Sequence, residues 1–540
     1  MKHRVVYAAL LASCGALAVP APTLAQGGPP ASLPPQAQAE IHLPDRFDTT
    51  RIPLRDMPDT ESPTVARGGR DFEPGRPFPV DHQNPTFQDP LVGRSEGLSS
   101  AVGVPRAFTD GTPVDPARRV APPDTTGDLG RTHYVQWVNL RYAIYSVTRS
   151  NGTISAFNLV PGFPKNGNAI WQGFGGACEQ YNDGDPVVQY DQLAGRWILT
   201  QFAVSATPYT QCVAVSTSED PTGTYNRYAY SYGTDFNDYP KMGVWPDGYY
   251  ITYNMFRRGR TFTGSRVCAF ERVKMLAGQA ARQACAQTSN SYGSLLPSDL
   301  EGAALPPTGA PNYLLSITSS ALQFWKFAVN WSSGTGTLTG PTTVAGVAAF
   351  SRACGGGTCI PQPGTTQKLD SLADRLMYRL SYRSLGTRAS LLVNHSVASG
   401  GVTGIRWYDL NIASGSPTVY QQGTWQPDLN YRWMGSAAMD KTGGIAIGYS
   451  VSNATTVKPS IWYVYRSPAD PLGTVGPEIQ VLLGFGSQTG NSLSRWGDYA
   501  TMSIDPVDGC TMVFTTQYIP TNGSFNWATA IQSLRLSSCQ

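Results

Sequence analysis

Short runs in which apolar and polar residues alternate dominate the chain from residue 122 onward. Alternation of this kind predicts strands that bury one face. Two such runs, at residues 141–149 and 153–160, flank Asn151 and Gly152, a dipeptide typical of a two-residue hairpin turn. Long stretches with apolar residues at helical spacing are absent from the sequence, so the pattern predicts an all-β protein.

The strand, turn, strand pattern recurs along the chain. Its clearest copy is SRWGDYATMSIDPVDGCTMVFT at residues 494–515, and residues 237–255 repeat it with Met242 in the place of Met502. The copies are about 50 to 70 residues apart, which predicts a β-propeller of four-stranded blades. Seven blades fit best, and six or eight stay open. We place the middles of the first strands at Tyr134, Val188, Met242, Tyr313, Tyr378, Ala437 and Met502.

Three segments precede or make up this repeat. Residues 1–25 have the basic start, apolar core and small-residue exit of an export signal. Residues 26–120 form a Pro- and Gly-rich leader, and residues 121–540 form the propeller. Residues 11–14 resemble a lipoprotein box, but a conventional cleavage site follows, so a secreted or periplasmic product is favoured over lipid attachment at Cys14. We expect residues 85–120 to complete the last blade, because an open blade would expose a strand edge.

The composition of the chain indicates which kinds of binding partner are expected. The formal charge of +3 is small for 540 residues and does not predict binding to nucleic acid. After the signal, the sequence lacks the ~20 consecutive apolar residues of a membrane helix. We expect a monomer whose partner is a glycan or an extracellular or cell-surface protein.

The cysteine count agrees with export. Nine cysteines are present, and eight remain once Cys14 leaves with the signal. Pairing neighbours in an oxidising compartment predicts four disulfides: Cys178 with Cys212, Cys268 with Cys285, Cys354 with Cys359, and Cys510 with Cys539.

A series of motifs resembles a family of secreted bacterial proteins with repeated β-rich units and no established activity. The resemblance rests on PPDTTGDLG (122–130), HYVQWVN (133–139), NDYPKMGVWPDGYY (237–250), RWMGSAAMD (432–440) and RWGDYATMSIDP (495–506). The blades are also distantly similar to sialidase-type propellers. The turn with Asp191, Gly195 and Trp197 is similar to their Asp box, with a longer spacing.

Polar residues at the starts of the predicted first strands would converge near the propeller axis. Asp185, Asp238 and Asp498 are the candidate catalytic residues, since paired carboxylates serve as acid and base or nucleophile in glycoside hydrolysis. Asp374 would belong to the same ring. The candidate substrate-binding residues are Arg375, Arg432 and Arg495 for an anionic group, and Tyr239, Tyr378, Tyr499 and Trp496 for a sugar. Alternatively, these Asp and Arg residues pair with one another and only hold the blades together.

Metal and cofactor chemistry finds little support in the sequence. The NDGD segment supplies hard oxygen ligands at Asp183 and Asp185 that suit calcium, without the spacing of an EF-hand. Otherwise no cofactor is expected.

Two functions stay open at this stage. The first is a binding or adhesion module that recognises a glycan or surface partner at the channel mouth. The second is a glycoside hydrolase or polysaccharide lyase acting on an anionic glycan, with Asp238 or Asp498 as acid or base.

Overall fold

The computed structural model describes residues 35–59, 77–80, 86–115, 119–490 and 492–540. The predicted export signal and Cys14 lie outside these residues. Strands account for nearly all of the regular structure, and the two α-helices of the described part, α1 (Ala177–Gln180) and α2 (Arg272–Leu276), have four and five residues. The all-β prediction is confirmed. No helix within the described ranges is long and apolar enough to cross a membrane.

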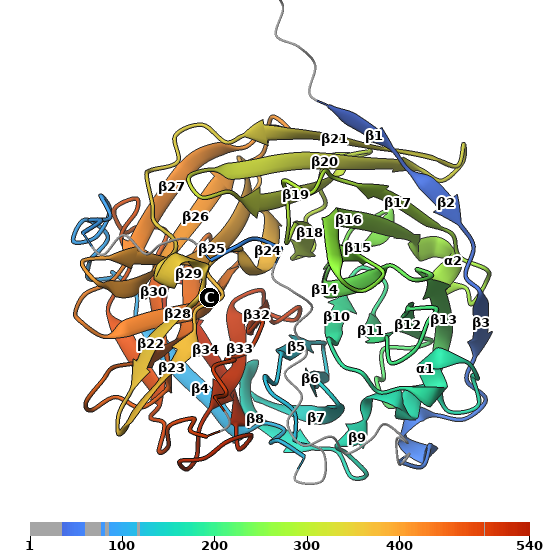
Figure 1. Ribbon diagram of the computed structural model, residues 1–540, viewed down its shortest axis with the longest axis horizontal. Helices are drawn as coiled ribbons and strands as arrows, with labels where there is room; N and C mark the ends of the chain where they lie inside the picture. Colours follow the sequence, from blue (N-terminus) through green and yellow to red (C-terminus); the bar gives the residue numbers. More distant parts are fainter. Residues whose placement is uncertain (1–34, 60–76, 81–85, 116–118, 491) are drawn as a thin grey trace, which may run out of the picture. The chain divides into compact units, whose positions relative to one another are not determined.

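The strands form four-stranded antiparallel units, and in every unit except the last the order of the strands in space equals their order in the chain. The hairpin predicted at Asn151 and Gly152 connects the third and fourth strands of the first unit, and both residues have positive φ (50° and 75°), as this turn requires. In Figure 1 the first strand of each unit lies toward the middle and later strands lie farther out. The arrangement is that of a β-propeller.

The units share this plan and differ in strand length. Their strands are, unit by unit, β5 (Thr125–Leu129), β6 (His133–Val138), β7 (Arg141–Ser150) and β8 (Thr153–Leu159); β10 (Val187–Asp191), β11 (Arg196–Ala203), β12 (Thr210–Ser216) and β13 (Tyr225–Ser231); β14 (Phe236–Val244), β15 (Gly248–Arg257), β16 (Thr261–Glu271) and β17 (Gln283–Gln287); β18 (Leu296–Glu301), β19 (Asn312–Ile317), β20 (Leu322–Asn330) and β21 (Thr335–Thr343); β24 (Met377–Ser384), β25 (Ala389–Ser399), β26 (Val402–Asn411) and β27 (Thr418–Trp425); β28 (Tyr431–Met439), β29 (Ile445–Ser452), β30 (Ser460–Arg466) and β31 (Glu478–Leu482); and β32 (Thr501–Ile504), β33 (Thr511–Tyr518), β34 (Ala528–Leu536) and β4 (Gly103–Asp110).

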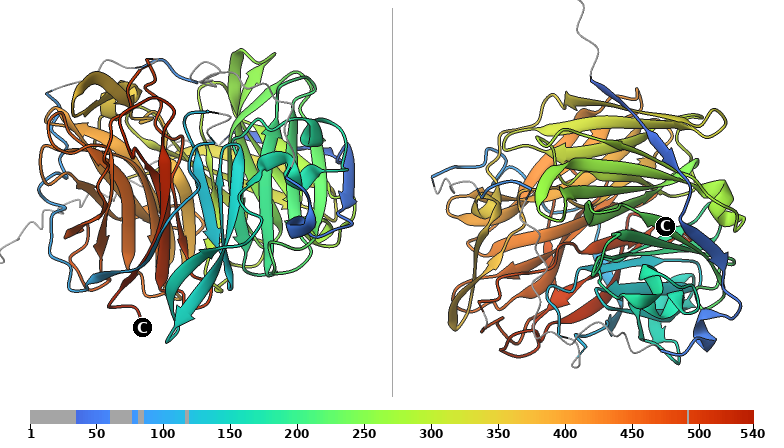
Figure 2. Two further views of the ribbon diagram at one scale, coloured as in Figure 1. Left: turned by 90° about the horizontal axis from the view of Figure 1, so that it is seen from below. Right: turned by 45° about the vertical axis from the view of Figure 1, so that its right-hand side comes forward.

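Further short elements lie in the leader and in the segments between units. They are η1 (Leu54–Asp56), β9 (Lys165–Asn166), η2 (Gly167–Trp171), η3 (Ala353–Gly356), and the hairpin of β22 (Thr358–Gln362) and β23 (Thr365–Asp370). Figure 2 shows the sheets standing side by side around the molecule.

Neighbouring units touch through their first strands all the way round. Each first strand contacts the next, and β32 of the last unit contacts β5 of the first. β18 and β24 also pair in parallel, which joins their units into one sheet. At the junction of the last and first units, Arg149 on β7 forms an ion pair with the buried Asp505. The last unit thus contacts the first through packed strands and an ion pair, without a continuous ladder of strands between them.

Segments of the leader supply further strands. β4 pairs with β34 and completes the last unit, as expected for residues 85–120. β1 (Gln36–Gln38), β2 (Glu40–His42) and β3 (Arg46–Thr49) pair with the outer strands β21, β17 and β13 in turn. They form the blue ribbon along the rim in Figure 2. The sequence pattern did not indicate these three strands, because they are very short and mostly exposed.

Two of the predicted first strands are second strands. Tyr134 lies on β6 and Tyr313 on β19, because β5 and β18 precede them in their units. The sequences of these true first strands, TTGDL and LPSDLE, mix Gly, Pro and acidic residues. Both strands are fully buried although they lack an alternating apolar pattern, which is why they were missed.

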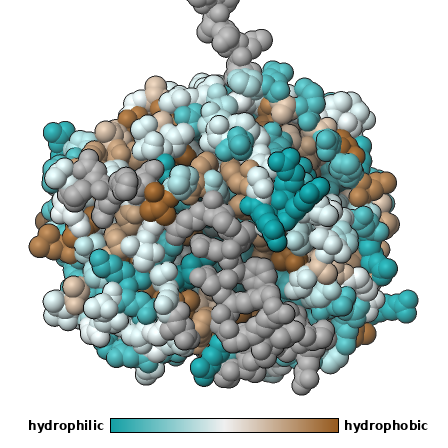
Figure 3. Space-filling model, viewed as in Figure 1, coloured by the Kyte–Doolittle hydropathy of each residue, from teal (hydrophilic) through white to brown (hydrophobic). Residues whose placement is uncertain are grey.

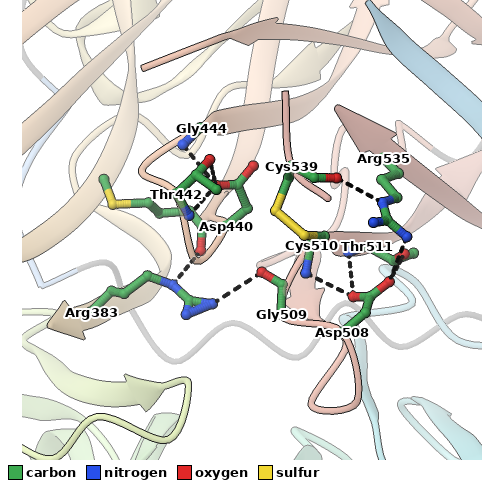
Figure 4. Close-up of a disulfide and its surroundings, with 11 residues drawn as sticks. Arg383, Asp440, Thr442, Gly444, Asp508, Gly509, Cys510, Thr511, Arg535 and Cys539 are labelled. Carbon is green, nitrogen blue, oxygen red and sulfur yellow. Dashed lines mark hydrogen bonds and ion pairs between the residues drawn. A yellow bond between two sulfur atoms is a disulfide. The ribbon is translucent and has the colours of Figure 1, made fainter. Parts of the chain in front are cut away.

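All four predicted disulfides are formed. Figure 4 shows the last of them, Cys510–Cys539, which ties the chain's end to the β32–β33 turn. Beside it, Arg383 of the β24 unit donates hydrogen bonds to the carbonyls of Met439 and Gly509, in the next two units (2.7 and 3.5 Å). The disulfide thus fastens the last unit internally, and the hydrogen bonds of Arg383 link three consecutive units.

Candidate functional site

Several first strands have a residue in the left-handed region of backbone conformation, either just before the strand or in its first half. The φ angles of Asp124, Asp185, Tyr239, Ser294 and Met434 lie between 45° and 55°. Each such residue costs on the order of 1–3 kcal/mol, and such positions concentrate at functional sites. Their recurrence at equivalent places directs attention to the starts of the first strands.

Four carboxylates and one ammonium group gather there. We call Asp124, Asp185, Asp238, Asp498 and Lys241 the entry cluster. They come from the starts of β5, β10, β14 and β32 and lie close enough for their charges to perturb one another. The structure thus brings together the three candidate catalytic residues of the sequence analysis and adds Asp124 and Lys241.

The surroundings of Asp238 favour the protonated form of its carboxyl group. It is half-buried. Burial raises its pKa well above the ordinary value, the negative charges of Asp185 and Asp498 raise it further, and Arg375 and Arg495 act in the opposite direction. Within the described residues, no hydrogen bond or ion pair engages its carboxyl group. Asp238 therefore keeps its proton to a higher pH than an ordinary aspartate does, and it can donate this proton to a ligand.

The other two buried aspartates show the same tendency. Burial raises the pKa of Asp185 to about 6, with a further contribution from the charge of Asp498. For Asp124, burial and then the charges of Asp498 and Asp185 raise the pKa well above its usual value. The entry cluster therefore binds protons more tightly than isolated carboxylates would.

Asp498 differs from these three because it has a cationic partner. Arg495, three residues earlier, forms an ion pair with its carboxylate, and 14% of the Asp498 side chain remains exposed. Arg375 pairs in the same way with the adjacent Asp374, at 2.8 and 3.1 Å. Two of the three predicted substrate-binding arginines, Arg375 and Arg495, thus lie by the entry cluster with an acidic partner close in sequence.

Lys241 is buried, and its ammonium group lies against two aromatic rings. Its Nζ is 3.3 Å from the ring centre of Tyr239 and 3.8 Å from that of Tyr499, and it donates to the carbonyl of Pro240. Burial lowers its pKa to about 7, although Asp185 and Asp498 act to raise it. Lys241 can thus change charge near neutral pH together with the acids.

The three candidate tyrosines fill the space between the first strands. Their hydroxyl groups donate to backbone carbonyls of other units: Tyr239 to Asp498 (3.3 Å), Tyr499 to Pro186 (2.8 Å) and Tyr378 to Met242 (3.0 Å). All three side chains are buried. They pack the axis, and contact with a sugar stays a prediction for them.

A second buried charge cluster, absent from the sequence analysis, surrounds Arg379. The guanidinium group pairs with Asp128 (3.1 Å), Asp299 (2.8 Å) and Glu301 (3.5 Å), which belong to β5 and β18. Burial raises the pKa of Glu301 to about 8 and that of Asp299 to about 6, while Arg379 acts in the opposite direction. Arg379 follows the expected site residue Tyr378, but nothing in the sequence indicated its acidic partners.

Two further predicted binding residues have structural partners elsewhere. Arg432 is buried and pairs with Glu478 (2.7 Å) and Asp428 (2.7 Å), so its charge is used within its own unit. Trp496 is buried against Trp433 and donates to the hydroxyl of Ser450 (3.0 Å). The structure does not bring Arg432 to the entry cluster, and Trp496 packs between units.

The turn aspartates are engaged by the chain itself. Asp183 accepts hydrogen bonds from the backbone N–H groups of Val204 (2.6 Å) and Ser205 (2.7 Å). Among the described residues, no group of three or more His, Cys, Asp or Glu is placed to hold a metal ion. Calcium near Asp183 and Asp185 stays a prediction. Asp191, of the turn similar to an Asp box, accepts from two backbone N–H groups and pairs with Arg272 (2.6 Å).

Comparison with known proteins does not assign this chain to a family. No family model and no curated protein matches it. Solved structures it is similar to include an α-L-arabinanase of Penicillium chrysogenum (9% identity, 81% of this chain and 98% of that chain, TM-score 0.35). The chain is also similar to an exo-β-1,3-galactanase of Phanerochaete chrysosporium (10% identity, 80% of this chain and 99% of that chain, TM-score 0.31). A third similar structure is a protein of unknown function from Dyadobacter fermentans (13% identity, 65% of this chain and 94% of that chain, TM-score 0.33). At these TM-scores the likenesses determine neither fold nor activity.

Proposed function

We propose that the chain is a secreted glycoside hydrolase whose site is the entry cluster. The observation that supports it is the contrast between two neighbouring carboxyl groups at the strand starts. Asp238 is disposed to hold a proton, and Asp498 carries an ion pair with Arg495. Paired acids whose surroundings separate their protonation states are what acid and base roles require.

The roles follow from this contrast. Asp238 gives its proton to the glycosidic oxygen as the bond between that oxygen and the sugar carbon breaks. The Asp498 carboxylate takes a proton from the attacking water, whose oxygen forms the new bond to the sugar. Because Asp238 acts only while protonated, activity falls as the pH rises through its pKa.

The charges of the site favour a neutral glycan. Five carboxyl groups (Asp124, Asp185, Asp238, Asp374 and Asp498) are accompanied by three basic groups (Lys241, Arg375 and Arg495). Both arginines already have an acidic partner, so clamping an anionic sugar would require breaking an ion pair. The anionic substrate of the sequence analysis is therefore less favoured than a neutral one. On the face seen in Figure 3, hydrophilic and hydrophobic residues are interspersed among the coloured residues.

The fold and location belong to the same proposal. Seven blades are supported by seven first strands that contact one another in sequence, from β5 round to β32. Export to an oxidising compartment is supported by the four disulfides. A monomer acting on an extracellular glycan completes the proposal.

The binding module is the second candidate, and one observation favours it. The Asp498 carboxylate is already paired with Arg495, so it could take a proton from water only if this ion pair opened. In this form of the proposal, the entry cluster would bind a glycan through its hydroxyl groups without cleaving it.

The experiment is a screen of the purified chain against neutral and anionic oligosaccharides, with binding and reducing-end release both measured. We expect release from neutral glycans that Asp238→Asn abolishes, while Asp235→Asn, on the surface of the same unit, leaves it unchanged. Binding without release would favour the binding module. Neither binding nor release for any glycan would overturn both candidates.

A further inference from the structure

Asn139, in the turn between β6 and β7, joins two of the entry aspartates. It is buried, and its φ is 35°. Its side-chain oxygen accepts a hydrogen bond from the backbone N–H of Asp185 (3.2 Å), and its Nδ2 donates to Oδ2 of Asp124 (3.0 Å). The same Nδ2 also donates to the carbonyl of Pro122. One amide group thus fixes the starts of β5 and β10 together.

The connections continue from Asp124 to the remaining members. Oδ1 of Asp124 accepts from the backbone N–H of Asp498 (2.8 Å). The hydroxyl of Tyr239 donates to the carbonyl of Asp498, and the backbone N–H of Tyr239 bonds to the Asp185 carboxylate. The path from Asn139 through Asp124, Asp498, Tyr239 and Asp185 back to Asn139 is closed. It links the starts of β5, β10, β14 and β32.

Asn139 is itself held rigidly. Its carbonyl accepts a hydrogen bond from the indole of the buried Trp137 (2.9 Å). Gly184 lies so near that a Cβ atom there would approach the Asn139 side-chain oxygen to 2.4 Å. Left-handed φ values favour Gly, Asn and Asp, and of these only Asn offers both a neutral donor and an acceptor. Asn therefore fits this position in two ways: it tolerates the left-handed backbone, and its side chain can both donate and accept a hydrogen bond.

We propose that Asn139 is a positioning residue for the reaction at the entry cluster. It fixes Asp185 directly and Asp498 through Asp124, so that both lie at set places around Asp238. This inference rests on the proposed function. Displacements on the order of 1 Å in such a site cost ~100-fold in rate, so losing the amide should be visible in turnover.

The main variant is Asn139→Gly, which removes the amide and tolerates the left-handed backbone. Its matched control is Asn151→Gly, at another left-handed asparagine, in the exposed β7–β8 turn. On a neutral oligosaccharide that the wild type cleaves, we expect kcat to fall ~10–100-fold in Asn139→Gly with little change in KM, and no change in the control. Equal kcat in both variants would overturn the proposal.

A third variant separates positioning from a merely structural role. Asn139→Asp keeps the shape and the acceptor for Asp185, but it can donate to Asp124 only while one of the two facing carboxyl groups is protonated. We therefore expect the activity of Asn139→Asp to approach that of the wild type at acidic pH and to be lost above neutral pH. A pH profile parallel to the wild-type profile would contradict the proposed link.

An activity-independent measurement keeps this test distinct from that of the proposed function. In protein labelled with 13C at the aspartate carboxyl groups, Asn139→Gly should shift the pH titration of Asp185, and Asn151→Gly should not. If no glycan is cleaved, the proposed function fails, and this titration still decides whether Asn139 positions the acids. Identical titration curves in wild type and Asn139→Gly would refute the positioning role.

Discussion

Replacing Asp185 with Asn should stabilise the protein at neutral and higher pH and leave its stability unchanged at acidic pH. The folded state raises the pKa of Asp185 from its ordinary 3.8 to about 6, mainly through burial. The folded chain then holds this proton more tightly than the unfolded chain, so stability is lost as the pH rises from about 4 to about 6. At ~1.36 kcal/mol per pKa unit, the cost at pH 8 is about 3 kcal/mol. Asn cannot ionise, keeps the shape, and still accepts from the backbone N–H of Tyr239.

The assay is urea unfolding of wild type and Asp185→Asn at pH 4 and pH 8. We expect equal stability at pH 4 and a gain of about 3 kcal/mol for the variant at pH 8. Asp235→Asn, at a surface position, serves as the control and should show no pH-dependent difference. If Asp185→Asn were less stable than wild type at pH 8, or if the stability difference did not depend on pH, the ionised Asp185 carboxylate would not destabilise the folded protein, and the reasoning would be refuted.

Three further predictions concern the links that hold the ring together. Arg379→Met leaves three buried carboxyl groups without their cation and should lower the free energy of unfolding by ~3–5 kcal/mol at pH 8, with a smaller loss at pH 5, as urea unfolding would show. Asp505→Asn weakens the ion pair with Arg149 between the last and first units and should expose both units to proteolysis sooner, whereas equal digestion rates would contradict a closing role. Opening the 29-residue loop with Cys510→Ser and Cys539→Ser should cost ~3–4 kcal/mol, measured under conditions that keep the other disulfides intact.

Sequence patterns predict much of this fold because strands and tight turns depend mainly on residues that are close together in the sequence. Alternation and the Asn151–Gly152 turn identify strands and hairpins, and neighbouring cysteines identify the disulfides. The pattern fails where strands lie at the centre, since β5 and β18 are buried on all sides and carry Asp and Pro. It also fails for β1 to β3, whose pairing depends on the edges of distant strands rather than on their own side chains.

Part of the candidate site was predictable because its aspartates lie at the starts of strands that the repeat pattern identifies. Asp185, Asp238 and Asp498 stand at strand starts, and the structure brings them together. Lys241 and Asn139 gave no signal, because their roles arise from contacts between units and from a left-handed turn. Arg432 occupies a comparable place in the sequence, yet Glu478, 46 residues later, engages it. Such partners depend on how the units pack, which the repeat pattern does not contain.

The measurement that tests the central claim most directly is the protonation state of Asp238 at neutral pH. Infrared difference spectroscopy of wild type against Asp238→Asn at pH 7, repeated at higher pH, reports whether this carboxyl group carries a proton. The account predicts a protonated carboxyl band in the wild type that the variant lacks and that disappears as the pH rises. A carboxylate band at pH 7 would remove the acid from the proposed site and contradict the account.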